Sequence, residues 1–109
     1  MSRSSIITDA DDRAEWLENP SVGDILASEF MKPLALDAAK LGEAIGIPTE
    51  IVKAVVSGEQ RVDGEIDLRL GKYFRMSEGF FLRLQAAYEL EEAKRALNGA
   101  LEAIVPRAA

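Results

Sequence analysis

The chain has 109 residues with no cysteine and no histidine, and its 13 Lys and Arg against 19 Asp and Glu give a net charge of −6. One domain fits this length, whereas a two-domain enzyme does not. The missing residue types exclude disulfides, thiolate chemistry and the commonest general base and metal ligand, so the sequence predicts no enzyme, catalytic residue, metal or cofactor. The acidic balance opposes non-specific attraction to nucleic acid or anionic lipid.

Residues 1–20 form a predicted acidic N-terminal arm. Five acidic side chains accompany two arginines there, and the stretch ends at the breaker pair Asn19-Pro20. We place a folded domain over residues 21–90 and a helical extension over residues 91–109. No apolar run approaches the ~20 residues that span a bilayer, and no secretory signal is present, which indicates a cytoplasmic protein without membrane contact.

The first two predicted helices have clear start and stop signals. Ser21 opens the first with a capping box, in which its hydroxyl accepts from the Asp24 backbone and the Asp24 carboxylate reaches back. Pro33 stops this helix. Asp37 caps the second helix, which ends at Gly46, a residue type suited to the left-handed backbone at a helix C-terminus.

Three further helices complete an all-α prediction. The third starts at Pro48 and ends at Gly58, and Asp63 caps the fourth. Ser77 is expected to cap the fifth, which we predict over residues 78–103. Since no segment alternates apolar and polar residues as a strand would, the predicted fold is a five-helix domain with an extended C-terminal helix.

Residues 38–57 carry the strongest pattern in the chain, that of a helix-turn-helix. Such a unit needs a small residue where the helices cross and a residue tolerant of positive φ in the turn, and Gly42 and Gly46 meet these needs. Apolar residues stand where the two helices must lock together: Leu41, Ile45, Ile47, Val52 and Val55. An αα-hairpin inside a helical bundle, without contact to DNA, is the alternative for the same pattern.

Six runs between Ser21 and Leu90 share one further pattern: Gly23-Asp24-Ile25-Leu26, Glu29-Phe30, Leu41-Gly42, Ala44-Ile45-Gly46-Ile47, Leu68-Arg69-Leu70 and Leu84-Gln85-Ala86-Ala87-Tyr88-Glu89-Leu90. Through these runs the sequence resembles the HigA-type antitoxins of the lambda-repressor-like (Xre) helix-turn-helix class. It implies a lambda-repressor-like five-helix domain and a homodimer. It also implies a cognate mRNA-cleaving toxin as partner, and repression of the operon that encodes both proteins through double-stranded operator DNA.

The third helix is the expected recognition helix, which presents one face to the major groove. Its outward positions, counted from the turn, are Thr49, Glu50, Lys53, Ala54 and Ser57. Lys53 can donate to guanine or to a phosphate, Glu50 can accept from cytosine N4, and Thr49 can offer its methyl group to thymine. Contacts to the DNA backbone are expected from Lys40, Arg61 and the helix N-termini. Alternatively, Glu50 and Lys53 form a surface ion pair at i, i+3 spacing.

Two departures from the family pattern keep other functions open. The recognition helix opens with Pro48-Thr49-Glu50-Ile51 instead of a basic run, and the loop after it, Glu59-Gln60-Arg61, carries one cation. A protein-binding module that has lost DNA binding fits these changes, and a stand-alone phage-type regulator is a further alternative.

Apolar residues near the C-terminus predict either a dimer seam or a terminal helix that lies on its own domain. They are Leu97, Leu101 and Ile104.

Overall fold

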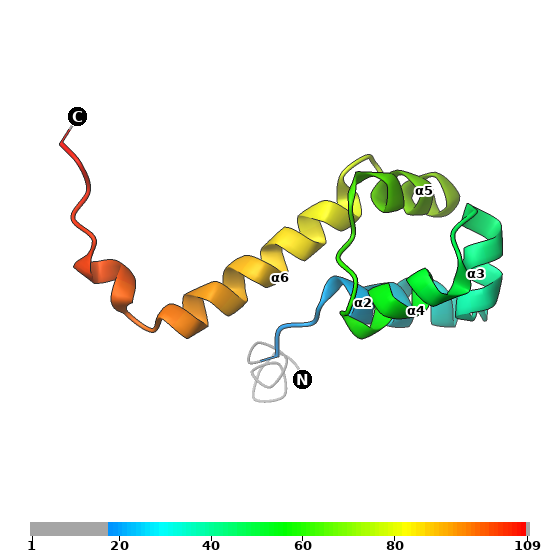
Figure 1. The fold of residues 1–109 in the computed structure, drawn as a ribbon, viewed down its shortest axis with the longest axis horizontal. Helices are drawn as coiled ribbons and strands as arrows, with labels where there is room; N and C mark the ends of the chain where they lie inside the picture. The colour runs from blue at the N-terminus through cyan, green and yellow to red at the C-terminus, as the bar shows by residue number, and fades with distance from the viewer. Residues whose placement is uncertain (1–17, 109) are drawn as a thin grey trace, which may run out of the picture.

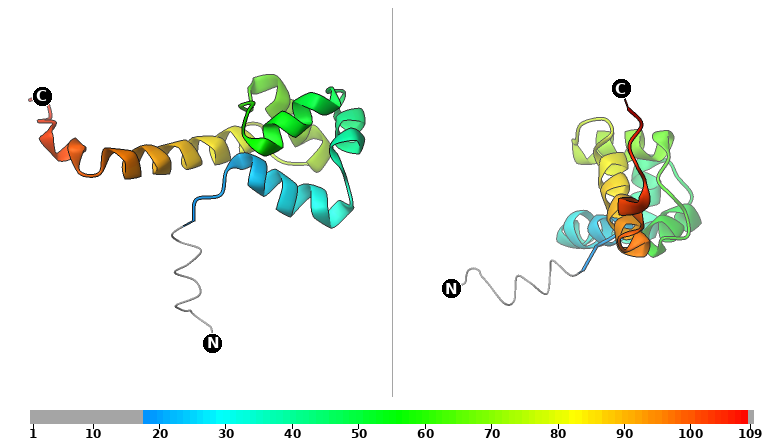
Figure 2. Two further views of the ribbon diagram at one scale, coloured as in Figure 1. Left: turned by 60° about the horizontal axis from the view of Figure 1, so that its bottom comes forward. Right: turned by 90° about the vertical axis from the view of Figure 1, so that its left-hand side faces the viewer.

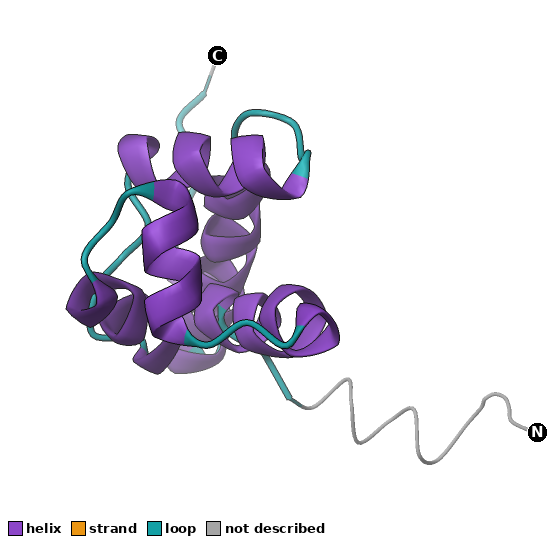
Figure 3. Ribbon diagram, turned by 90° about the vertical axis from the view of Figure 1, so that its right-hand side faces the viewer, coloured by secondary structure: helices purple, strands orange, loops and turns teal. Residues whose placement is uncertain are grey.

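The computed structural model describes residues 18–108, and every regular element within that range is helical (Figures 1 and 3). The elements in chain order are α2 (Val22–Ile25), η1 (Leu26–Met31), η2 (Lys32–Leu34), α3 (Ala38–Ile45), α4 (Thr49–Ser57), α5 (Gly64–Phe74), α6 (Phe80–Leu97) and η3 (Ala100–Ala103). The continuous run from α2 to η2 is the predicted first helix. The all-α, five-helix prediction is therefore confirmed; of the predicted acidic arm, only residues 18–20 lie in the described range.

The first helix starts as predicted but is irregular in its second half. Ser21 and Asp24 form the capping box, with both backbone-to-side-chain bonds at 3.1 Å. Beyond Ile25 the helix widens into the π-helical η1 and then tightens into the 3₁₀ turn η2. Against the prediction that Pro33 stops this helix, Pro33 lies inside η2 and the helical run ends one residue later, at Leu34. Proline is tolerated there because the first positions of a helical turn need no backbone donor.

The helix-turn-helix pair, α3 and α4, has the predicted geometry. Asp37 caps α3 by accepting from the Lys40 backbone N–H at 2.8 Å. A Cβ at Gly42 would lie 2.5 Å from the Ile47 carbonyl oxygen, so only glycine lets the turn approach α3 this closely. Gly46 then adopts φ 75°, the left-handed conformation that the tight turn requires.

A single apolar core joins all five helices. Its buried members are Val22, Leu26, Met31, Leu41, Ile45, Val52, Val55, Val62, Ile66, Leu70 and Phe81. Phe30 extends the core toward the end of α5 and the start of α6, with ring centroids 5.0 Å from Phe74 and 5.2 Å from Phe81. The core therefore fixes α4 relative to the other helices while leaving the opposite face of α4 outside.

The predicted start of the last helix is wrong. Helix α6 begins at Phe80 after Gly79, with no cap from Ser77. Instead the carboxylate of Asp67, on α5 and only 2% exposed, accepts the backbone N–H groups of Gly79 at 2.6 Å, Phe81 at 2.9 Å and Leu82 at 3.1 Å. A buried charge from the neighbouring helix thus replaces the local cap, because it satisfies three donors where a serine hydroxyl satisfies one.

The predicted end of the last helix is also wrong, since α6 stops at Leu97 and not near residue 103. Asn98 and Gly99 both adopt left-handed backbone conformations, at φ 43° and 91°, which end the helix before the short turn η3. Figures 1 and 2 show α6 leading away from the other helices, and residues 92–108 are all exposed. The alternative that this segment lies on its own domain is therefore wrong. None of the described helices is long and apolar enough to cross a bilayer.

Candidate nucleic-acid interface

The outward face of α4 carries all five predicted recognition residues. Glu50, Lys53 and Ser57 are exposed, while Thr49 and Ala54 are half-buried at its edge. Val52 and Val55, on the opposite side, are buried in the core. The amphipathic pattern of the sequence thus separated the inner from the outer face correctly, and the roles of the outer residues toward DNA remain predictions.

The alternative of a Glu50–Lys53 ion pair is not realised among the described residues. Both side chains are exposed, and neither has a charged partner within 4.0 Å in residues 18–108. The ammonium group and the carboxylate therefore remain available for an external partner. Ser57 is less available, because its hydroxyl donates to the Ala54 carbonyl oxygen at 3.1 Å.

Lys40 stands apart from the α4 residues, in the first turn of α3. Its backbone N–H already donates to the Asp37 carboxylate. This donor is therefore occupied, and the negative charge of Asp37 disfavours binding of a phosphate at this helix N-terminus. Its ammonium group is on an exposed side chain without an ion-pair partner in the described structure. The contribution of α3 to a DNA backbone contact would therefore come mainly from that ammonium group.

Arg61, the predicted cation of the loop after α4, is held by α6. Its Nε lies 2.8 Å from Oε2 of Glu89 and its Nη2 lies 3.0 Å from Oε1, so the two groups meet edge to edge. These hydrogen bonds, helped by the opposite charge, lower the pKa of the Glu89 carboxyl and raise that of Arg61. Arg61 is therefore neutralised by Glu89, a partner that no local sequence pattern indicated.

Gln85, one helical turn before Glu89, holds the same loop more deeply. Its side chain is 4% exposed, accepts from the Val62 backbone N–H at 2.8 Å and donates to the Val62 carbonyl oxygen at 2.9 Å. Sequence reasoning missed this role, although a polar residue four positions after the core residue Phe81 was the available signal. The helix-turn-helix itself does not require the run Leu84 to Leu90. The structure gives this run a role, because its residues Gln85 and Glu89 position the loop beside the recognition helix.

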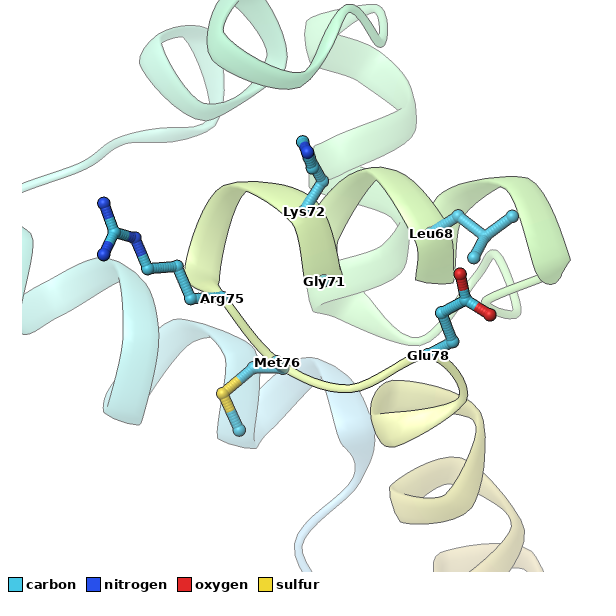
Figure 4. Close-up of a pocket in the computed structure, with 6 residues that line it drawn as sticks. All are labelled: Leu68, Gly71, Lys72, Arg75, Met76 and Glu78. Carbon is cyan, nitrogen blue, oxygen red and sulfur yellow. The ribbon is translucent and has the colours of Figure 1, made fainter.

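A shallow groove elsewhere holds none of the predicted site residues. It lies along α5 and the turn into α6, and its lining residues are Leu68, Gly71, Lys72, Arg75, Met76 and Glu78 (Figure 4). Across the described residues, no three Asp or Glu side chains gather where a metal ion could bind.

No family model matches this chain, but curated proteins and solved structures do. It is 35% identical over 72 residues to the uncharacterized HTH-type transcriptional regulator YbaQ of Escherichia coli K12, covering 66% of this chain and 64% of the relative. It is 32% identical over 78 residues to an uncharacterized HTH-type transcriptional regulator of Haemophilus influenzae, covering 69% of this chain and 73% of the relative. The chain thus spans slightly less than two thirds of the first of these proteins and somewhat more of the second.

Solved structures match over most of this chain. An addiction module antidote protein of a HigA family from Coxiella burnetii matches with a TM-score of 0.75 and 30% identity, covering 84% of this chain and 99% of that one. The antitoxin HigA of Pseudomonas aeruginosa with the higBA promoter matches with a TM-score of 0.74 and 26% identity, covering 84% and 100%. The antitoxin GraA in complex with its operator matches with a TM-score of 0.74 and 28% identity, covering 84% and 93%.

Proposed function

This chain belongs to the HigA-type antitoxins of the lambda-repressor-like helix-turn-helix class, and from that premise we propose that it is an antitoxin that represses its own operon. The observation that carries the proposal is the outward face of α4, whose inner face is buried in the core and whose Glu50 and Lys53 form no ion pair with the residues that the structure describes. Two similar solved structures, HigA with a promoter and GraA with its operator, support DNA as the partner. The proposal assigns no catalytic step, metal or cofactor, and it places the protein in the cytoplasm with its operator.

In this proposal α4 enters the major groove with its N-terminus leading. Thr49, Glu50 and Lys53 contact base edges, and Ala54 and Ser57 line the groove beside them. Lys40 and Arg61 contact the DNA backbone on either side. Since so few cations are involved, the affinity should depend only weakly on salt concentration.

The experiment that tests this function is fluorescence anisotropy with the duplex upstream of the protein's own gene and with a scrambled duplex, at two salt concentrations. We expect the wild type to prefer its own duplex. The variant Glu50→Ala/Lys53→Ala should lose about tenfold in affinity for that duplex, because each lost single contact is worth less than the ~1–3 kcal/mol of a good bidentate one.

A matched control keeps net charge and exposure comparable. Glu78→Ala/Lys72→Ala removes one exposed anion and one exposed cation from the groove on α5 and the turn after it (Figure 4). It should bind the duplex as the wild type does. Equal losses in the two double variants would show that α4 has no special role.

The remaining partners follow from the family. We propose a cognate mRNA-cleaving toxin, contacted in part by the acidic arm of residues 1–20, since a toxin that binds RNA is expected to be basic. Deleting residues 1–20 should then weaken toxin binding, and an unchanged affinity in calorimetry would contradict this role for the arm. We further propose the arrangement of arm, helix-turn-helix domain over residues 21–90 and helical extension over residues 91–109, with the extension joining two copies into a homodimer.

A second candidate function is a protein-binding module that binds the toxin but not DNA. The sparse charge of the α4 face favours it: Glu50 stands near the start of the helix, and the loop cation Arg61 is neutralised by Glu89. A protein-binding module predicts that Glu50→Ala/Lys53→Ala leaves every activity unchanged. It also predicts equal, weak and salt-sensitive binding of the wild type to both duplexes.

A further inference from the structure

The loop between α4 and α5, residues 58–63, contains a single cation, Arg61. Helix α6 contacts this loop at two places. Gln85 forms two buried hydrogen bonds with the backbone of Val62, and Glu89 forms an exposed ion pair with Arg61. Because Gln85 fixes the backbone of Val62, next to Arg61, the position of the Arg61 backbone is defined. Its side chain extends toward α6 and ends on Glu89.

We propose that Glu89 is a positioning residue that withholds Arg61 from the operator phosphates and so keeps the affinity of this protein for DNA below what its cations would allow. The inference rests on the proposed function, operator binding through α4. It adds a residue that is on neither helix of the helix-turn-helix and touches no DNA in that proposal.

The geometry of the ion pair gives the physical reason. A guanidinium binds a phosphate best through one edge that offers two parallel N–H groups, and in Arg61 the Nε–Nη2 edge is occupied by both oxygens of Glu89. The carboxylate also adds a negative charge where a phosphate would have to approach. A phosphate can therefore take this edge only by displacing Glu89.

The pair is exposed enough for this exchange to matter. The side chains of Arg61 and Glu89 are 68% and 43% exposed, and exposed ion pairs are weak. Because the exposed ion pair can open, Arg61 can leave Glu89 when DNA binds. The ion pair therefore weakens DNA binding but does not block it. Glu89 thus sets the strength of the contact, and not its existence.

The test is the operator affinity of Glu89→Gln, measured by anisotropy on the duplex upstream of the gene over a series of salt concentrations. Glutamine keeps the size of the side chain but removes the charge and the second acceptor. We expect about three- to tenfold tighter binding at low salt. The plot of log affinity against log salt should steepen by up to about 0.9, the release of one whole counterion, because Arg61 contacts a phosphate in only part of the wild-type complexes.

A double-mutant cycle shows whether Glu89 acts through Arg61. In an Arg61→Ala background, Glu89→Gln should change the affinity little, because no cation remains to be released. The matched control is Glu65→Gln, which removes the carboxylate of a similar exposed ion pair with Arg69, at 3.0 Å on α5. It should leave the salt dependence as in the wild type, and thermal melts check that all variants fold.

Three results would overturn the inference. Weaker binding by Glu89→Gln would mean that Glu89 aims Arg61 at the phosphate. An equal gain in the Arg61→Ala background, or in Glu65→Gln, would reduce the effect to general charge. If neither the wild type nor Glu89→Gln prefers its own duplex, the proposed function and the inference both fail.

A preference that appears only in Glu89→Gln would support the inference and contradict repression by the wild type.

Discussion

Asp67 shows how one buried side chain can set the start of a helix. It lies in the first turns of α5, where an acidic residue looks like an ordinary solvent-facing one, yet its carboxylate accepts three backbone N–H groups around the first turn of α6. Removing it takes this partner from one buried donor, Phe81, and from two partly buried ones, and buried unsatisfied groups are more costly than the average net gain of a hydrogen bond. Asp67 should therefore matter more to stability than any local cap in this chain.

Asp67→Ala is predicted to lower the free energy of unfolding by about 2–4 kcal/mol, because charge-assisted bonds to three donors are lost. Urea unfolding followed by circular dichroism measures this loss. Asp63→Ala is the comparison, since Asp63 caps α5 with one bond to the Ile66 N–H at 2.9 Å, and its loss should be about 1 kcal/mol. Similar losses for the two variants would contradict the role of Asp67 as the cap of α6.

The Arg61–Glu89 pair makes a prediction about titration. The hydrogen bonds from Arg61 hold the pKa of Glu89 below its ordinary value, so the pair stabilises the fold at neutral pH and loses this contribution as the pH falls through the lowered pKa. In a carboxyl-carbon NMR titration, Glu89 should titrate at lower pH in the wild type than in Arg61→Gln, where the pKa of Glu89 should rise toward the ordinary value of a glutamate. Arg83→Gln removes a different exposed arginine and should leave the midpoint of Glu89 unchanged; a shift there would point to a general charge effect.

The helices differ in how well their first and last residues could be predicted from the sequence. Helices capped by their own residues were predicted correctly, as at Ser21, Asp37 and Asp63, because each cap contacts a backbone group three positions away. The start of α6 was not, because its cap comes from Asp67, 12 residues before Gly79 and on another helix. The end of α6 was signalled by Asn98-Gly99, a pair suited to left-handed backbone, but the continuing apolar spacing of Leu97, Leu101 and Ile104 favoured a longer helix.

Gly23 lies where two elements, α2 and α4, cross closely. A Cβ placed there would clash with the backbone carbonyl oxygens of Val55 and Val56, which cannot move away without disturbing the recognition helix. In the sequence, Gly23 stands out only as part of the family resemblance, since the need for a small residue at this position arises from a contact 32 residues away in the chain. The crossing distance of α2 and α4 thus depends on this glycine.

Gly23→Ala is predicted to destabilise the protein by about 1–3 kcal/mol or more, because an added methyl group overpacks a backbone contact. Its thermal midpoint should fall by about 4–8 °C for each kcal/mol. The matched control is Gly64→Ala, at the first position of α5, where a Cβ meets nothing within 4 Å. That variant should keep or slightly raise the midpoint, since alanine costs less backbone entropy; a rise in both variants would contradict the tight crossing.

Across the whole molecule, α6 links three regions that the sequence presents separately. Its start is fixed by Asp67 on α5, its middle holds the loop beside the recognition helix through Gln85 and Glu89, and Asn19 joins the chain before α2 to it by donating to the Tyr88 carbonyl oxygen at 3.0 Å. The outer face of α4 was predictable because helical periodicity is local. The partner of Arg61 was not, because it lies 28 residues away in the chain, and local patterns carry no information on such pairs.

The apolar residues beyond this anchored part of α6 lack a covering surface within the described chain. Leu97 is 42% exposed, Leu101 49% and Ile104 66%, on a segment that leads away from the domain (Figure 2). We therefore expect two copies to associate through them. A dimer is also what operator binding needs, because two recognition helices must be spaced about 34 Å apart, one turn of DNA, to read two half-sites.

Leu97→Asp/Leu101→Asp is predicted to convert the dimer to a monomer and to lower operator affinity by tenfold or more, since carboxylates in an apolar seam lose their hydration and half of the DNA contacts disappear. Sedimentation velocity gives the mass, and anisotropy gives the affinity. Leu34→Asp/Leu68→Asp is the matched control, because both leucines are more than half exposed on η2 and α5 and the change in charge is the same. If the control dissociates as well, the seam lies elsewhere; if the Leu97/Leu101 variant stays dimeric and still binds its operator, the C-terminal segment is not what joins the two copies.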